Sequence, residues 1–103
     1  MKQQLYPAPD EMTLTTVLAA LSDPVRLSIV SALARGERGS SDFDCDVSGS
    51  TLSHHIKALR EAGILFHRKE GTRCFVSLRP EFEAAFPGLL ASVLRFLPDA
   101  EAR

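Results

Sequence analysis

The sequence predicts a mainly α-helical domain that carries one small β-hairpin. Apolar residues recur at helical spacing through most of the chain, whereas two short β-favouring runs flank a glycine near position 70. A length of 103 residues suits one domain, and a composition with 45% hydrophobic and 24% charged residues is typical of globular proteins. We expect this domain to cover residues 11–97, between a flexible N-terminal arm (1–10) and a C-terminal tail (98–103).

The first two predicted helices lie close together in the sequence. One covers residues 11–21, where four apolar residues, Leu14, Val17, Leu18 and Leu21, share a helical face. The next begins at Asp23-Pro24, because aspartate caps helices and proline suits the first helical position. It ends before Gly36, since glycine adopts the left-handed conformation that stops a helix. Its apolar residues occupy two faces, which predicts a central position in the fold.

A loop over residues 37–50 leads to the third predicted helix. The loop has no clear hydrophobic period. We predict a helix over residues 50–62 that ends at Gly63. Its core face consists of Leu52, Ile56 and Leu59, which fall at spacings of four and three residues.

The β-hairpin follows this helix directly. A turn centred on Glu70-Gly71 would place Phe66 opposite Phe75 and His67 opposite Cys74. A short helix near residues 80–86 and a last apolar helix up to residue 97 complete the chain, with Pro87 between them. A helix-turn-helix followed at once by a two-stranded hairpin is a winged helix-turn-helix, and we predict that fold.

Charge is unevenly distributed along the chain. The net charge is −1, but residues 51–79 hold six Lys or Arg against two acids, and the remainder is acidic. Short hydroxyl and basic side chains at the start of a helix can reach base edges or phosphates in a major groove, and cations on a hairpin can grip the backbone. The candidate DNA-binding residues are Ser50, Thr51, Ser53, His54, Lys57, Arg68, Lys69 and Arg73.

Each candidate also has an ordinary structural explanation. The polar face of the third helix can be a solvated surface, and the cations of the hairpin can surround a solvated turn. His55 falls at the margin of the core face, where we expect a half-buried histidine bonded to the backbone. The combination of a basic segment with a helix and a wing favours DNA binding.

At "ALSDPVRLSIVSAL" and "STLSHHIKALREAGILFHRKEGTRCFVSL" the chain resembles winged-helix regulators of the ArsR/SmtB type. The first stretch resembles the helix before the helix-turn-helix of that family, and the second resembles its recognition helix and wing. Together the two stretches cover about half of the chain. The resemblance implies a homodimeric repressor that binds double-stranded operator DNA, dimerises through its first and last helices and is often released by an effector.

The metal sites of that family are missing their ligands here. Its arsenic- and cadmium-type sites need paired cysteines near the helix-turn-helix, where this chain has only Cys45, and its zinc- and nickel-type sites need histidine on the last helix. The local cluster of Asp42, Asp44, Cys45 and Asp46 with His54 and His55 is badly spaced, because adjacent helical residues point about 100° apart. We expect no metal and no cofactor, and the sequence identifies no effector.

The last predicted helix is apolar over too broad a face to pack on one side of a small monomer. We therefore expect it to form part of a dimer interface together with the first helix. The candidate interface residues are Leu14, Val17, Leu18, Leu89, Leu90, Val93, Leu94 and Leu97.

Two alternatives remain open at this stage. The acidic total charge would also suit a winged-helix module that contacts proteins and has lost DNA binding. The cysteines Cys45 and Cys74 could instead switch DNA binding through a thiol reaction. No catalytic motif, targeting segment or membrane-spanning run is recognisable, so we expect a cytoplasmic protein that is not an enzyme.

Overall fold

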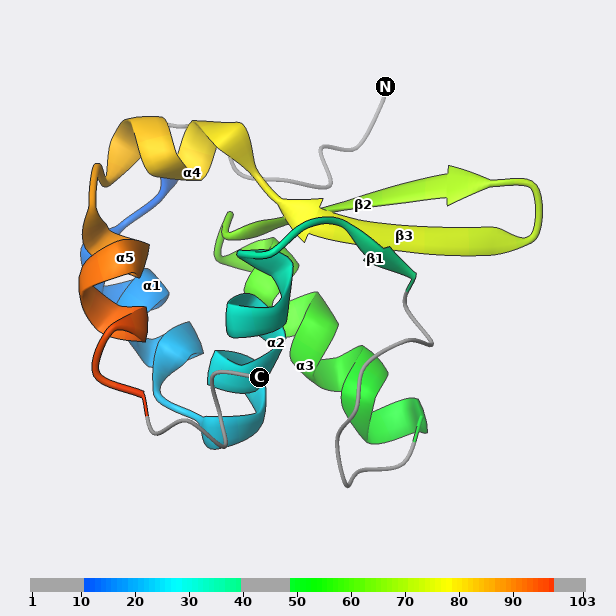
Figure 1. Ribbon diagram of the computed structural model, residues 1–103, viewed down its shortest axis with the longest axis horizontal. Helices are drawn as coiled ribbons and strands as arrows, with labels where there is room; N and C mark the ends of the chain where they lie inside the picture. Colours follow the sequence, from blue (N-terminus) through cyan, green and yellow to red (C-terminus); the bar gives the residue numbers. More distant parts are fainter. Residues whose placement is uncertain (1–10, 40–48, 98–103) are drawn as a thin grey trace.

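The computed structural model describes residues 11–39 and 49–97 and confirms a mainly helical fold with a wing. Along the chain the elements are α1 (Leu14–Leu21), α2 (Pro24–Leu33), β1 (Arg38–Gly39), α3 (Gly49–Glu61), β2 (Leu65–Glu70), β3 (Arg73–Leu78), α4 (Pro80–Ala85) and α5 (Leu89–Leu94). The hairpin of β2 and β3 projects to one side of the helices, above α3, while α1 and α5 lie at the other end of the long axis (Figure 1). The predicted arm and tail lie outside the described residues.

The starts of the first two helices are set by polar caps. Asp23 Oδ1 accepts hydrogen bonds from the backbone N–H groups of Val25 (2.8 Å) and Arg26 (3.1 Å), and Pro24 occupies the first turn, as predicted. The expected start of the first helix at residue 11 was too early. Thr13 is the cap, because its side-chain oxygen accepts from the backbone N–H of Thr16.

A tight turn joins α3 to the wing. Gly63 has a φ of 88°, which the absence of a side chain permits. The N–H of Ile64 then donates to the carbonyl of Leu59, and the N–H of Gly63 donates to that of Arg60, each at 3.0 Å. This is the paired bonding of a glycine-terminated helix. Because Ile64 and Leu65 are fully buried, the turn also fixes where β2 leaves the core.

In residues 11–39 and 49–97 the sheet has three antiparallel strands in the order β1-β3-β2, one more than the sequence predicted. Strand β1 is the unexpected one, since its Arg38 and Gly39 pair with Val76 and Phe75 inside the region expected to be a loop. The remaining residues of that loop, from 40 to 48, lie outside the described part of the chain.

The predicted register of the hairpin was wrong. His67 faces Val76 rather than Cys74, and Phe66 faces Ser77 rather than Phe75. The turn centres on Gly71-Thr72, with Gly71 at a φ of 64° and no non-glycine residue at positive φ in the described chain. A two-residue turn of this kind needs a positive φ only at its first central position, and glycine is the residue that suits it. The turn therefore lies one residue further toward the C-terminus than predicted.

The hydrophobic core lies between α1, α2, α3, the base of the sheet and α4. Its fully buried side chains are Val17, Ile29, Val30, Leu59, Ile64, Leu65, Val76 and Phe82. Helix α2 contacts α1, α3 and β3, which confirms its central position. Helix α3 meets this core through Ile56 and Leu59, with Leu52 packed against them, as the predicted face requires. The opposite face of α3 therefore stays available to solvent.

Candidate nucleic-acid interface

The outward face of α3 carries the residues that the sequence predicted. Thr51, Ser53, His54 and Lys57 are all exposed, while Ile56 and Leu59 on the opposite side are buried. Ser50 lies in the first turn of the helix. Since buried leucine and isoleucine side chains fix the rotation of α3, the polar face is presented in one orientation.

His55 links the two helices of the helix-turn-helix. The side chain is buried, and its Nδ1 accepts a hydrogen bond of 3.0 Å from Nε of Arg26 on α2. The sequence predicted a half-buried histidine bonded to the backbone, so the burial is confirmed but the partner is a side chain. The neighbouring His54 contacts the His55 ring edge-on, with centroids 5.9 Å apart, and stays exposed.

The hairpin has two chemically different faces. Residues directly opposite one another in an antiparallel pair point to the same side, so His67, Lys69 and Cys74 share the side of the buried Val76. We call this side the inner face. Arg68 and Arg73 share the outer face with Phe75, and their guanidinium carbons lie 4.6 Å and 5.1 Å from the centre of that ring. The three predicted wing cations are thus divided between the faces.

Arg68 is paired with acidic side chains. Its Nη2 and Nε donate to the two carboxylate oxygens of Glu37 at 2.8 Å and 3.3 Å, and its Nη1 lies 3.5 Å from Glu70. Hydrogen bonding from Arg68 lowers the pKa of Glu37, and the same bond raises the pKa of Arg68. Arg68 was predicted to contact DNA, and to do so it would have to break its bonds with Glu37. The sequence alone gave no sign of this pairing.

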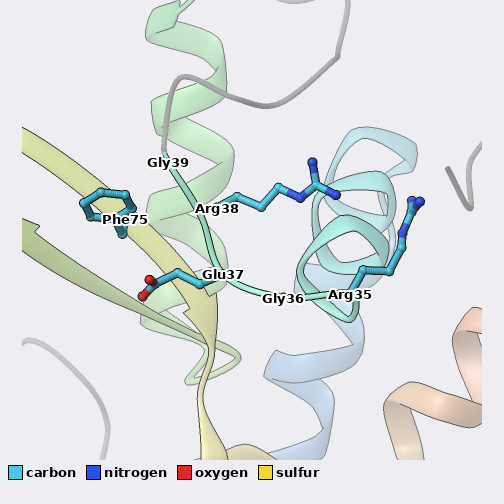
Figure 2. Close-up of a pocket in the computed structure, with 6 residues that line it drawn as sticks. All are labelled: Arg35, Gly36, Glu37, Arg38, Gly39 and Phe75. Carbon is cyan, nitrogen blue, oxygen red and sulfur yellow. The ribbon is translucent and has the colours of Figure 1, made fainter.

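Glu37 borders a cavity of about 360 Å³ at the junction of α2, β1 and β3. Figure 2 shows its carboxylate extending toward the strand that carries Phe75, whereas the Arg35 and Arg38 side chains extend the other way. The carboxylate therefore faces the hairpin, where it meets Arg68. This short segment ties the start of β1 to the wing.

Removing the Glu37 carboxylate should strengthen DNA binding. In Glu37→Gln, Arg68 loses its bidentate partner, so we expect affinity for duplex DNA to rise about two- to fivefold at low salt. The slope of log affinity against log salt concentration should also steepen, by up to about one released counterion. Arg68→Gln alone should lower affinity by no more than the same factor, because its charge is already paired and its loss leaves only the Glu37 carboxylate uncompensated. Fluorescence anisotropy at two salt concentrations measures both. A large loss of affinity in Arg68→Gln would show that Arg68 contacts DNA despite Glu37.

Two basic residues beside the interface were not predicted as site residues. Arg60 lies one helical turn beyond Ile56 on α3, and His67 stands on the inner face of the hairpin. Burial lowers the pKa of His67, and the nearby charges of Arg60 and Lys69 lower it further. Arg60 could have been found from the sequence, since it falls three residues after Lys57.

The predicted dimer residues divide between core and surface. Val17 is fully buried and Leu90 nearly so, and both belong to the core of this chain. On α1, Leu14 and Leu18 are 49% and 46% exposed. Leu89, Val93, Leu94 and Leu97 are half-buried. Phe96, which was not predicted, is 77% exposed. An apolar surface thus remains on α1 and around α5.

Within residues 11–39 and 49–97 no three His, Cys, Asp or Glu residues gather as metal ligands would. Cys74 is a free thiol, and Cys45 lies outside the described residues, as do Asp42, Asp44 and Asp46. None of the helices in this described part has both the length and the hydrophobicity of a membrane span. Helices α1 and α2 reach that length and composition only as a pair bent by 101°.

Known proteins resemble both the sequence and the fold. The model of the family described as "Bacterial regulatory protein, arsR family" matches residues 23–65, from the cap of α2 to the start of β2. The HTH-type transcriptional regulator YceK of Bacillus subtilis is 35% identical over 82% of this chain and 89% of its own length. The arsenical resistance operon repressor of Staphylococcus xylosus is 39% identical over 67% of this chain and 68% of its own length.

A solved structure agrees with these matches. A possible transcriptional regulatory protein from Mycobacterium bovis superimposes with a TM-score of 0.66 and 30% identity, over 80% of this chain and 90% of that one. The matched sequence includes both helices of the helix-turn-helix, and the matched structure extends over most of the domain. The chain belongs to the arsR family of bacterial transcriptional regulators, with a winged helix-turn-helix fold.

Proposed function

We propose that this protein is a homodimeric transcriptional repressor that binds an inverted-repeat operator in double-stranded DNA. The observation that carries the proposal is the outward face of α3, where Thr51, Ser53, His54 and Lys57 are exposed above a buried apolar face. Relatives named as repressors, such as that of Staphylococcus xylosus, support the direction of regulation. The proposal requires no metal, cofactor or enzymatic activity, and it places the protein with the DNA in the cytoplasm.

In this proposal α3 enters the major groove. Hydroxyl groups of Ser50, Thr51 and Ser53 and the imidazole of His54 reach base edges or phosphates, and Lys57 binds a phosphate. Lys69 and Arg73 contact the backbone from the wing, from its inner and outer faces respectively. The bond between Arg26 and His55 supports the proposal, because it holds α3 against α2 while leaving His54 exposed.

The dimer is built from the apolar surface of α1 and α5. Leu14 and Leu18 supply exposed area on α1, and Leu89, Val93, Leu94 and Leu97 supply it around α5. Two copies related by a two-fold axis would present two α3 helices to successive major grooves. The operator would accordingly be an inverted repeat.

Replacing Lys57 with glutamine should weaken binding to every DNA sequence. Because the charge contacts a phosphate, we expect roughly a tenfold loss at low salt and a salt slope reduced by about one. The measurement is anisotropy with the gene's own upstream DNA and a scrambled duplex, and Arg95→Gln, which removes a positive charge from the exposed residue after α5, serves as the control. Unchanged affinity in Lys57→Gln would contradict the docking.

The same titration tests the competing function. A winged-helix module for protein contact would show no binding to either duplex, even at low salt. Preference for the upstream duplex over the scrambled one would support a sequence-specific regulator.

A further inference from the structure

A second cavity, of about 340 Å³, lies between α3 and the hairpin. Its walls come from both elements proposed to touch DNA. It is lined by Ser53, Ile56, Lys57, Arg60, His67 and Cys74.

The helix wall is one continuous face of α3. Ser53, Ile56, Lys57 and Arg60 fall at positions i, i+3, i+4 and i+7, so their side chains lie along one side of the helix. Ile56 is buried at the base, and Lys57 is exposed at the rim. Lys57 therefore stands where this face meets the outward face proposed to enter the groove.

The hairpin wall is the inner face of the wing. His67 and Cys74 both point to the side of the buried Val76, and Lys69 lies directly across from Cys74. The residues of this face become more polar with distance from the core, from Leu65 through His67 to Lys69. The hairpin wall of the cavity therefore presents an imidazole and a thiol, and the exposed Lys69 lies farther out on the same face.

Among the described residues that line the cavity, Lys57 and Arg60 are cations and none is an acid. Within the described residues, no carboxylate lies within 4.0 Å of the Lys57 ammonium or the Arg60 guanidinium. Nε of Arg60 is buried and has no hydrogen-bond partner in the same part of the chain. Burial lowers the pKa of His67, and the positive charges of Arg60 and Lys69 lower it further, so these two cations act on the hairpin wall of the cavity.

We infer that this cavity is an oxyanion-binding site, which takes the tetrahedral group of a phosphate. Arg60 and Lys57 would supply the charge, and the Ser53 hydroxyl would supply a further donor. The phosphate comes either from the DNA backbone or from a small free anion. In the first case the inference rests on the proposed function and adds Arg60 to the DNA contacts. In the second case it identifies an effector site that DNA and anion would share through Lys57.

Cys74 lines the same cavity and can report its occupancy. The chain has two cysteines, so a Cys45→Ser variant leaves Cys74 as the only thiol. Iodoacetate and iodoacetamide both alkylate the thiolate sulfur with loss of iodide, but only iodoacetate is an anion. Their rate ratio, normalised to the ratio for N-acetylcysteine amide, measures the attraction of the cavity for negative charge.

We expect a normalised ratio of about three or more, since each nearby cation should contribute a factor of about three to five at low salt. Arg60→Gln and Lys57→Gln should each lower it toward one. Arg95→Gln, which removes a positive charge from the exposed residue that follows α5, should leave it unchanged. Circular dichroism confirms that each variant is folded. A normalised ratio of one in the folded Cys45→Ser protein would overturn the inference.

Protection of Cys74 from the neutral reagent distinguishes the two sources. Inorganic phosphate and duplex DNA are added separately at constant ionic strength. Protection by DNA alone assigns the site to a backbone phosphate, protection by phosphate alone assigns it to a free anion, and protection by both shows a shared site. DNA binding without protection by either overturns the inference but leaves the proposed function standing. Protection by phosphate in a protein that binds no DNA would support the anion site and overturn the proposed function.

Discussion

Replacing Leu14 and Leu18 together with glutamate is expected to convert the proposed dimer into a monomer and to lower affinity for the proposed operator DNA about a hundredfold. Both side chains are roughly half exposed on α1, so charge there should not disturb the core of the single chain. Two carboxylates in an apolar interface would remain desolvated without partners. A monomer also loses the gain in effective concentration that comes from linking two half-site contacts, which is on the order of 10²–10⁴.

Sedimentation equilibrium gives the oligomeric state, and anisotropy gives the affinity. The matched control places the same charges on another face of α1, as Thr15→Glu with Ala19→Glu, where both residues are also exposed. That control should remain dimeric. A dimer that survives in the Leu14/Leu18 variant, or a control that dissociates equally, would refute the interface on α1.

Replacing Leu59 with alanine is expected to destabilise the protein by about 2–5 kcal/mol. Leu59 is fully buried and anchors α3 to the core, so truncation leaves a cavity beneath the outward face. The free energy of unfolding of a small domain is about 5–15 kcal/mol in total, so this loss would remove a large share of the stability of the protein. The remaining folded protein should also bind DNA more weakly, since α3 would no longer be held in one orientation.

Urea unfolding followed by circular dichroism measures this change in the free energy of unfolding. Glu61→Ala, at an exposed site in the same helix, should stay within about 0.5 kcal/mol of the original protein. A loss below about 1 kcal/mol for Leu59→Ala would mean that α3 is not anchored as the structure shows.

The helices and the Asp23 cap were predictable because their causes are local, whereas the Thr13 cap was not predicted. The apolar period of Leu52, Ile56 and Leu59 gave the core face of α3, and Asp23-Pro24 gave the start of α2. The hairpin was equally visible, but its register was not. The register depends on which residue can take a positive φ at the first turn position, and only Gly71 satisfies that.

Features that depend on distant residues were missed. In the described part of the chain, strand β1 consists of Arg38 and Gly39, and it forms because β3 offers an edge to pair with. Glu37 and Arg68 are 31 residues apart, so no local pattern joins them. A broad apolar stripe also cannot separate core from surface, which is why Val17 and Leu90 were grouped with interface residues although this chain buries them itself.

Because His67 lines the cavity, anion binding there should depend on the protonation of this imidazole. Its pKa lies below the ordinary value in the folded chain, so the unfolded chain binds the proton more tightly, and stability falls as pH drops through about 6.5 and below. Of the described residues that line this cavity or share its hairpin face, the other groups that titrate or carry charge are Lys57, Arg60, Lys69 and Cys74, and none is a carboxylate. An anion held there would favour the protonated imidazole, so each binding event would take up part of a proton. Affinity for an anion of constant charge, such as a phosphodiester, would then increase with acidity, and pH would act on binding at this site.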